Sequence, residues 1–119
     1  MIKPKIKDCF IYLKDFTNID NFDFSIQGKI LNVEFYIVDE VSKKGVEKYS
    51  FSICSQQYVV ECILNGLVEP LNRKGFKILP NLTKNLILEY IATSINNSNT
   101  YTWDTLNKSL SEFFYTDYD

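Results

Sequence analysis

The stretch that decides the fold is "LNVEFYIVDEVSKKGVEKYSFSICS", residues 31–55. It holds two runs in which every second residue is apolar: Leu31, Val33, Phe35 and Ile37, then Tyr49, Phe51 and Ile53. Because successive side chains of a strand point to opposite faces of a sheet, each run predicts a strand with one buried face. The polar connection between them, residues 39–48, contains Gly45. The stretch therefore predicts a long antiparallel hairpin at the centre of a sheet.

Two apolar segments on the N-terminal side predict further strands. Residues 2–16 carry several apolar side chains, and a strand is the expected structure there. Next, Phe22, Phe24 and Ile26 alternate on even positions, whereas the hairpin alternates on odd ones. A change of phase needs an extra residue or a break in the strand, so Gly28, between the two phases, is expected at a bulge or tight turn.

The hairpin is expected to lead directly into a helix. Ser55 is a suitable N-cap because its hydroxyl can accept a hydrogen bond from an amide of the first turn. Val59, Ile63 and Leu67 then recur at intervals of four, which predicts one buried helical face. Gly66 is expected to end this helix, because glycine tolerates the left-handed conformation found after helix ends.

The rest of the chain predicts a short strand and two more helices. Residues 74–81, "KGFKILPN", form an apolar run that Pro80 closes, as expected for a strand followed by a turn. Thr102 is expected to cap the last helix, with Asp104 in its first turn. The expected buried faces are Leu88, Ile91 and Ile95, flanked by Ile87, in the first of these helices, and Trp103, Leu106, Leu110 and Phe113 in the second.

This order of elements predicts an α+β fold, an antiparallel sheet built on a long hairpin with about three helices packed against it. The 119 residues suit one domain, residues 1–119, and no internal repeat or long linker divides them. The three cysteines, Cys9, Cys54 and Cys62, are an odd number without a C-x-x-C pair. Reduced thiols and a packing role for Cys62 are therefore expected.

Composition narrows the functional classes. The N-terminus lacks the apolar core of a signal peptide, and no stretch approaches the ~20 apolar residues of a membrane span, so a cytoplasmic protein without membrane contact is expected. The net charge is −2, but residues 85–119 hold one lysine against five acids, a balance of −4. This asymmetry argues against nucleic-acid binding and favours a basic protein partner, although the acids could equally be a solvated surface.

The side chains that most enzymes use are sparse. The chain has no histidine, no G-x-S-x-G motif, no glycine-rich phosphate loop and no zinc-ligand spacing of its cysteines. Acid pairs such as Asp39 with Glu40, or Asp117 with Asp119, are the only candidates for acid–base chemistry. A loop and a chain end offer such pairs no evident desolvated pocket. The sequence therefore predicts a protein that is not an enzyme and uses no cofactor or metal.

The layout resembles the immunity protein 8 family of bacterial polymorphic toxin systems. The resemblance rests on the "F-x-F-x-I" pattern at residues 22–26, the strand at 49–53 that runs into a helix, the strand before Pro80 and the C-terminal signature. That signature comprises Thr102, Trp103, Leu106, Leu110 and "FFYTDY" at 113–118. Family members usually carry more glutamate, and often tryptophan, where this chain has Phe113, Phe114 and Thr116.

The resemblance implies a non-enzymatic protein that binds and neutralises a cognate toxin domain, encoded by the adjacent gene, in the cytoplasm of the producing cell. The alternative is an intracellular adaptor that binds a protein other than a toxin. The candidate contact residues are Glu112, Asp117, Asp119, Tyr115, Tyr118, Asp104, Asp39 and Glu40. At Asp104, the alternative to partner contact is stabilisation of the helix N-terminus. At the hairpin connection, the alternative is an ordinary solvated turn. Trp103 is expected to pack in the core.

Overall fold

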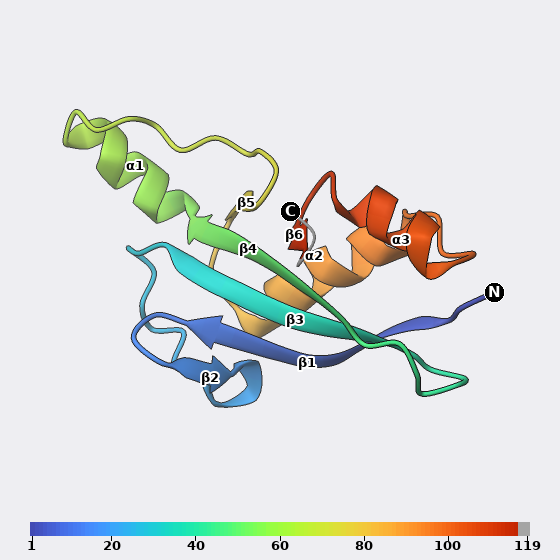
Figure 1. Cartoon of the computed structure of the whole chain (residues 1–119). Coiled ribbons are helices and arrows are strands. Elements are labelled where there is room, and N and C mark those ends of the chain that lie inside the picture. Colours follow the sequence, from blue (N-terminus) through green and yellow to red (C-terminus); the bar gives the residue numbers. More distant parts are fainter. Residues whose placement is uncertain (117–119) are drawn as a thin grey trace.

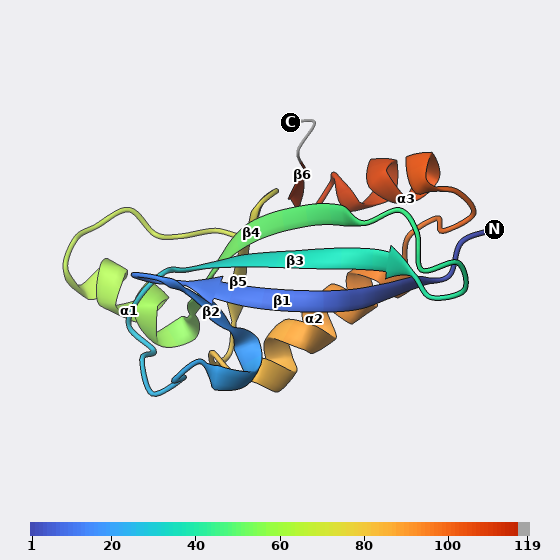
Figure 2. The same ribbon diagram turned by 60° about the horizontal axis from the view of Figure 1, so that its bottom comes forward.

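The computed structural model describes residues 1–116. Its strands are β1 (Pro4–Tyr12), β2 (Phe16–Asn18), β3 (Leu31–Asp39), β4 (Glu47–Ser55), β5 (Phe76–Leu79) and β6 (Tyr115–Thr116). Its helices are α1 (Gln56–Leu64), α2 (Lys84–Asn96) and α3 (Trp103–Leu110), with one 3-10 turn, η1 (Ile19–Asn21). Figures 1 and 2 show β1, β3 and β4 side by side, with α1 near one end of the sheet and α3 near the other.

The predicted fold class is confirmed: six strands form a mainly antiparallel sheet, and three helices pack against it. The strand order is β2-β1-β3-β4-β5, and β6 pairs with β4 as well. The hairpin of β3 and β4 is regular from Leu31 opposite Ile53 to Ile37 opposite Glu47. β5 pairs with β4 in parallel, because the chain crosses over through α1 and a long loop before it returns to the sheet.

The main core lies on the face of the sheet that the odd-numbered residues of β3 and β4 form. Phe35 and Tyr49 stack at 5.4 Å between ring centroids, and Phe114 meets Phe35 edge-on at 5.0 Å. The helices that cover this face contribute fully buried side chains from α2 (Ile87 and Ile91) and α3 (Leu106 and Leu110). The alternation in residues 31–55 therefore identified the buried face correctly.

A second, smaller core lies on the opposite face of the sheet, next to α1. Cys54, an even-numbered residue of β4, clusters there with Val59 of α1 and Phe76 of β5. Because side chains alternate along a strand, Cys54 and Ile53 must point to opposite faces. The helices therefore cover both faces of the sheet, α2 and α3 on one side and α1 on the other.

The two ends of α1 agree with the prediction, but its buried face does not. The Ser55 hydroxyl accepts from the Tyr58 amide at 3.3 Å, and Gly66 adopts φ +69° just past the last turn. Val59 and Cys62 are buried, whereas Ile63 and Leu67 are 53% and 62% exposed. The predicted stripe was wrong because the helix turns its i, i+3 face towards the sheet.

The strand predicted at Phe22–Ile26 is absent; these residues form a looping segment between η1 and β3. Phe22 and Phe24 still pack against the main core, with ring centroids 4.8 Å apart. A side-chain acceptor takes the place of a strand partner in the loop, since the Asp23 carboxylate accepts from the Ser25 amide at 3.0 Å. An alternating apolar pattern can therefore come from a loop that covers a core as well as from a strand.

Gln27 joins this loop to the segment before α2. Its side-chain amide donates to the Phe24 carbonyl at 2.7 Å and to the Leu82 carbonyl at 3.0 Å, while its Oε1 accepts from the Leu82 amide at 2.8 Å. The Ser55 hydroxyl donates to the Gln27 carbonyl at 2.5 Å. One side chain thus satisfies the backbone of two loops, which explains how an irregular segment can lie against the core.

Three further expectations change in detail. The single strand expected within residues 2–16 is β1 followed by the short β2, which pairs back with it. In α2 the fully buried side chains are Ile87 and Ile91, and Leu88, expected in the stripe, is only partly buried. After α3 the buried residue is Phe114, whereas Phe113, expected in the core, is 39% exposed. The helix ends at Leu110, so helical spacing no longer applies at residue 113.

All three cysteines are buried and unpaired, as expected for Cys62. Burial raises the pKa of the Cys9 thiol to about 12 and that of Cys54 to about 11. Nucleophilic attack needs the thiolate, so these two thiols are poor nucleophiles near neutral pH. Within residues 1–116, no helix combines the length and the apolar character needed to cross a membrane.

Candidate functional site

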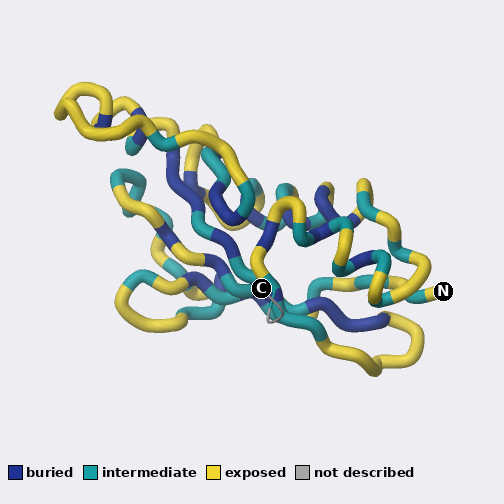
Figure 3. The backbone as a smooth tube through the Cα atoms, turned by 45° about the horizontal axis from the view of Figure 1, so that its top comes forward, coloured by how far each residue is buried: buried dark blue, intermediate teal, exposed yellow. Residues whose placement is uncertain are grey.

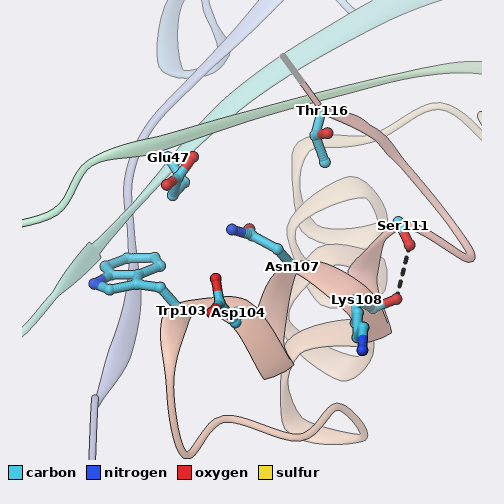
Figure 4. Close-up of a pocket in the computed structure, with 7 residues that line it drawn as sticks. All are labelled: Glu47, Trp103, Asp104, Asn107, Lys108, Ser111 and Thr116. Carbon is cyan, nitrogen blue, oxygen red and sulfur yellow. Dashed lines mark hydrogen bonds between the residues drawn. The ribbon is translucent and has the colours of Figure 1, made fainter. Parts of the chain in front are cut away.

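An open groove of about 480 Å³ lies between β4 and α3 (Figure 4). Its lining residues come from β4 (Glu47), from α3 and the residue after it (Trp103, Asp104, Asn107, Lys108 and Ser111), and from β6 (Thr116). In Figure 4 the side chains of Glu47 and Asp104 approach the groove from different elements, and the Trp103 ring stands at one end. We refer to this feature as the α3 groove.

Local sequence determines where α3 begins. The Thr102 hydroxyl accepts from the Thr105 amide at 3.2 Å, and the Thr105 hydroxyl accepts from the Thr102 amide at 3.0 Å. This reciprocal capping box satisfies amides that a helix start otherwise leaves without partners. Asp104 then stands in the first turn, where the helix dipole favours a negative charge. Its carboxylate is exposed, so capping leaves it accessible from the groove.

Trp103 fits against the backbone of the hairpin connection. Gly45 has φ +69°, and a Cβ at this position would lie 2.5 Å from the Trp103 Nε1 atom. A larger residue at position 45 would therefore displace the indole as well as strain the backbone. Trp103 is partly buried and packs against the main core, in agreement with the expected packing role, and it also forms a wall of the groove.

The floor of the groove is joined to the sheet by a hydrogen bond from a buried tyrosine. Tyr49 is 1% exposed, and its hydroxyl donates to Oδ1 of Asn107. Leu106 and Leu110, on the inward side of α3, are completely buried. These contacts hold α3 against β4, so the groove is built on rigid elements of secondary structure.

The groove has the chemistry to accept a positively charged side chain. Glu47 and Asp104 supply two carboxylates, and an indole face attracts a cation through its quadrupole. Lys108 also lines the groove, and the Ser111 hydroxyl donates to its carbonyl at 2.7 Å. A guanidinium or ammonium group placed between the carboxylates and Trp103 would gain both ion pairing and stacking.

A second surface, along β5, is basic. We call the residues Arg73, Lys74 and Lys77 the cationic edge, and each of them lies over an aromatic ring. The distances from the cation to the ring centroid are 5.5 Å for Arg73 over Phe76, 5.2 Å for Lys74 over Tyr115 and 5.2 Å for Lys77 over Tyr90. Glu112 and Phe113 share a hollow of about 310 Å³ with Arg73, Lys74 and Lys77.

This placement changes the meaning of the charge asymmetry along the sequence. Glu112 and Tyr115 were predicted to belong to an acidic surface of the C-terminal third. Both are exposed, but the fold sets them beside three cations that precede residue 85. Among the described acids of the C-terminal third, Asp104 therefore lies in the α3 groove and Glu112 lies at the cationic edge, so these two do not share one acidic face.

Asp39 has a structural role in the hairpin connection. Its carboxylate accepts from the Lys3 amide at 3.1 Å, the Val41 amide at 3.2 Å and the Ser42 hydroxyl at 2.8 Å. These bonds, the one from Lys3 first, lower the pKa of Asp39 below its usual value. The residue is 8% exposed, so the structure does not present it to a partner as the sequence suggested. Its neighbour Glu40 is exposed.

Replacing Asp39 should destabilise the protein in a pH-dependent way. An acid whose pKa is lowered by folding stabilises the fold above its unfolded pKa, and this contribution is lost as the pH falls through the folded pKa. We expect Asp39→Ala to unfold at a lower temperature than the wild type at about pH 7, with the difference shrinking below about pH 4. Thermal unfolding followed by circular dichroism gives the unfolding temperatures of the variant and of the wild type at each pH. Exposed Glu40→Ala is the control, and a pH-independent difference would contradict the role of the carboxylate.

The structure brings few of the predicted contact residues together. Asp104 lines the α3 groove, Glu112 and Tyr115 lie at the cationic edge, and Glu40 is at the hairpin connection. Asp117, Tyr118 and Asp119 lie outside the described residues. Sequence reasoning missed Glu47 and Asn107 because nothing local marks them. The register of β4 and the position of α3 across the core decide their place.

Comparison of the chain with protein-family models, with curated proteins and with solved structures gives no match. Among residues 1–116, no three or more cysteine or acidic side chains gather in an arrangement that could hold a metal ion.

Proposed function

We propose that this chain is a cytoplasmic immunity protein, which binds and neutralises the toxin domain encoded by the adjacent gene. The observation that carries the proposal is the α3 groove, in which Glu47 and Asp104 face a space closed by the Trp103 indole. One of its walls, Trp103, belongs to the C-terminal signature on which the resemblance to immunity proteins rests. Its role is binding alone, so no catalytic residue, cofactor or metal is assigned.

The groove suits a toxin with a basic surface, such as a nuclease with a substrate cleft that attracts phosphate. An arginine or lysine from that cleft would enter between the two carboxylates and stack on Trp103. Occupation of the cleft would then exclude the nucleic acid. The acids would also steer the encounter, which raises association rates when the partner carries the opposite charge.

The strength that this function requires is within reach of an ordinary interface. Protection against a few toxin molecules per cell needs a Kd near 1 nM, or about −12 kcal/mol. An interface of about 1,600 Å² can supply this if a few aromatic or charged residues are fully desolvated at its centre. We place Trp103, Glu47 and Asp104 at that centre.

Co-expression with the adjacent toxin gene tests the proposal. We expect the chain to restore growth of cells that produce the toxin domain, and to co-purify with that domain. A toxin domain from an unrelated system is the matched control and should be neither bound nor neutralised. Failure both to bind and to protect against any adjacent toxin-like domain would contradict the proposal.

The alternative is an adaptor that binds an intracellular protein without toxic activity. The observation in its favour is a set of aromatic side chains on the sheet face away from the main core, where Phe16 is 62% exposed and Phe10 meets Tyr36 edge-on at 6.2 Å. Aromatic residues often anchor protein interfaces. A stable complex with a non-toxic protein, in cells without an adjacent toxin gene, would favour this alternative.

A further inference from the structure

An aliphatic patch covers the outer side of α1 and the loop that follows it. It consists of Val60, Ile63, Leu64, Leu67, Val68 and Leu71, which are between 46% and 92% exposed. Figure 1 shows that α1 and this loop project from the rest of the molecule. In Figure 3 most of their backbone has the colour of exposed residues. These six side chains lie within twelve residues of the chain, so exposed apolar surface is concentrated on this segment of the molecule.

The first three residues of the patch lie on α1, which is apolar over more than half of its circumference. Val59 and Cys62 face the sheet and are buried. At 100° per residue, Val60, Ile63 and Leu64 fall on the adjoining side of the helix. An amphipathic surface helix normally has one apolar stripe, which faces the core. Here a second stripe adjoins it and has no cover among the described residues.

Few charges interrupt the patch. Residues 56–72 contain no lysine or arginine, and their two acids are Glu61 and Glu69. The Glu61 carboxylate turns away towards the loop before β3, since a Cβ on Gly28 would lie 3.1 Å from Oε2 of Glu61. Its Oε1 accepts from the Gln57 side chain at 3.1 Å. The six residues of the patch are thus all aliphatic, and the other charged residues near them in the chain are Glu69, between Val68 and Leu71, and Arg73.

This composition fits a second copy of the chain better than a transient partner. Interfaces between proteins that also exist separately are enriched in tyrosine, tryptophan and arginine at their centre. Homodimer interfaces are more apolar than these. The patch contains only valine, isoleucine and leucine, which is the composition of a core.

The size of the patch also fits a dimer. Taking roughly 120 Å² for a fully exposed aliphatic side chain, the six residues expose on the order of 500 Å² together. Two patches would then bring about 1,000 Å² of apolar surface to one interface. A standard interface buries about 1,600 Å² in total, and homodimer interfaces are about 65% apolar, which corresponds to about 1,000 Å².

We infer that the chain forms a two-fold symmetric homodimer in which the aliphatic patches of two copies pack against each other. A two-fold contact pairs the same surface on both subunits, and an aliphatic surface is complementary to itself. Glu69 and Arg73, which are close to the patch in the chain, carry both signs of charge. The α3 groove is formed by other elements, so the inference does not depend on the proposed toxin partner.

Sedimentation velocity of the purified chain over a range of concentrations tests the inference. We expect the wild type to sediment as a dimer at about 10 μM, a level at which dimers with Kd near 1 μM are largely formed. Leu64→Glu and Leu67→Glu should each raise the dimer Kd at least about tenfold, because each buries an unpaired charge in the interface. Val41→Glu, at a residue that is 74% exposed on the hairpin connection, is the matched control and should leave the dimer intact.

Circular dichroism spectra and unfolding temperatures are measured for the same variants, together with the milder Leu64→Ser. All the substituted side chains are largely exposed, so each variant should fold. A wild-type monomer at 100 μM would overturn the inference, as would dimers that survive the combined Leu64→Glu and Leu67→Glu substitutions. If the wild type is a monomer and these variants lose toxin binding instead, the patch serves a different partner and the inference is wrong.

Discussion

Phe114→Ala is expected to lower the free energy of unfolding by about 3–5 kcal/mol, the range for removing a fully buried phenylalanine. Phe114 is 0% exposed, although it stands only a few residues from the C-terminus. Its ring centroid lies 5.0 Å from that of Phe35, 4.9 Å from that of Phe51 and 5.7 Å from that of Tyr90. It therefore joins β3, β4 and α2 in one aromatic cluster.

The loss of unfolding free energy should be large for a single substitution, because the residues around Phe114 cannot easily move to fill the space that its ring leaves. Strands hold Phe35 and Phe51, and the Phe114 amide donates to the Leu110 carbonyl at 2.9 Å, which holds the backbone at the end of α3. Removal of the ring leaves a cavity between fixed elements, and such cavities add to the lost transfer free energy. Since domains are typically stable by about 5–15 kcal/mol, the variant should lose a large share of its stability.

Urea denaturation followed by fluorescence of Trp103, the single tryptophan, measures the effect. Phe113→Ala is the matched control, because the neighbouring residue is the same type but 39% exposed. We expect this control to lose clearly less than Phe114→Ala, since its side chain is partly exposed and does not belong to the main core. Similar losses for the two variants would contradict the assignment of Phe114 to the core.

The second large effect is expected on binding. Combined charge reversal, Glu47→Lys with Asp104→Lys, should raise the Kd for the cognate toxin domain by at least about 100-fold, because loss of a partner in a desolvated charge pair costs about 2–5 kcal/mol. The reversal both removes the carboxylates that accept the cation and repels it. Folding should change little: Asp104 is exposed, and its helix-dipole contribution is about 0.3–1 kcal/mol.

Isothermal titration calorimetry with the purified toxin domain gives the Kd, and two further variants locate the site. Glu47→Gln with Asp104→Asn removes the charges without repulsion and should give a smaller loss. Glu112→Lys places the same reversed charge at the cationic edge and should leave the Kd nearly unchanged. If Glu112→Lys weakens binding and the double reversal does not, the contact surface lies at the cationic edge and the groove is not the site.

Local patterns along the chain were sufficient to predict the elements that make their own hydrogen bonds or bury one regular face. The hairpin followed from alternation within residues 31–55, and the starts of α1 and α3 followed from the capping hydroxyls of Ser55 and Thr102. These features depend on residues close together in sequence. Alternation did not distinguish the loop at Phe22–Ile26 from a strand, because both can place every second side chain against a core.

The candidate site was harder to predict, since it depends on which elements become neighbours. Asp104 was identified from its position in a helix, but its companions in the groove, Glu47 and Asn107, come together only when α3 packs beside β4. Asp39 looked like an exposed acid of a polar turn. In the structure it is buried and accepts a hydrogen bond from the Lys3 amide, 36 residues away in the chain.

The amino-acid sequence was enough to establish an α+β domain centred on one hairpin, because alternation and capping act within a few residues. Which residues lie next to each charged side chain depends on long-range packing. The crossover that returns β5 beside β4, and the pairing of β6 with β4, place Arg73, Lys74 and Lys77 next to Glu112 and Tyr115. A count of charges along the chain suggested an acidic C-terminal surface, but electrostatic interactions depend on distance in space, and the fold sets that distance.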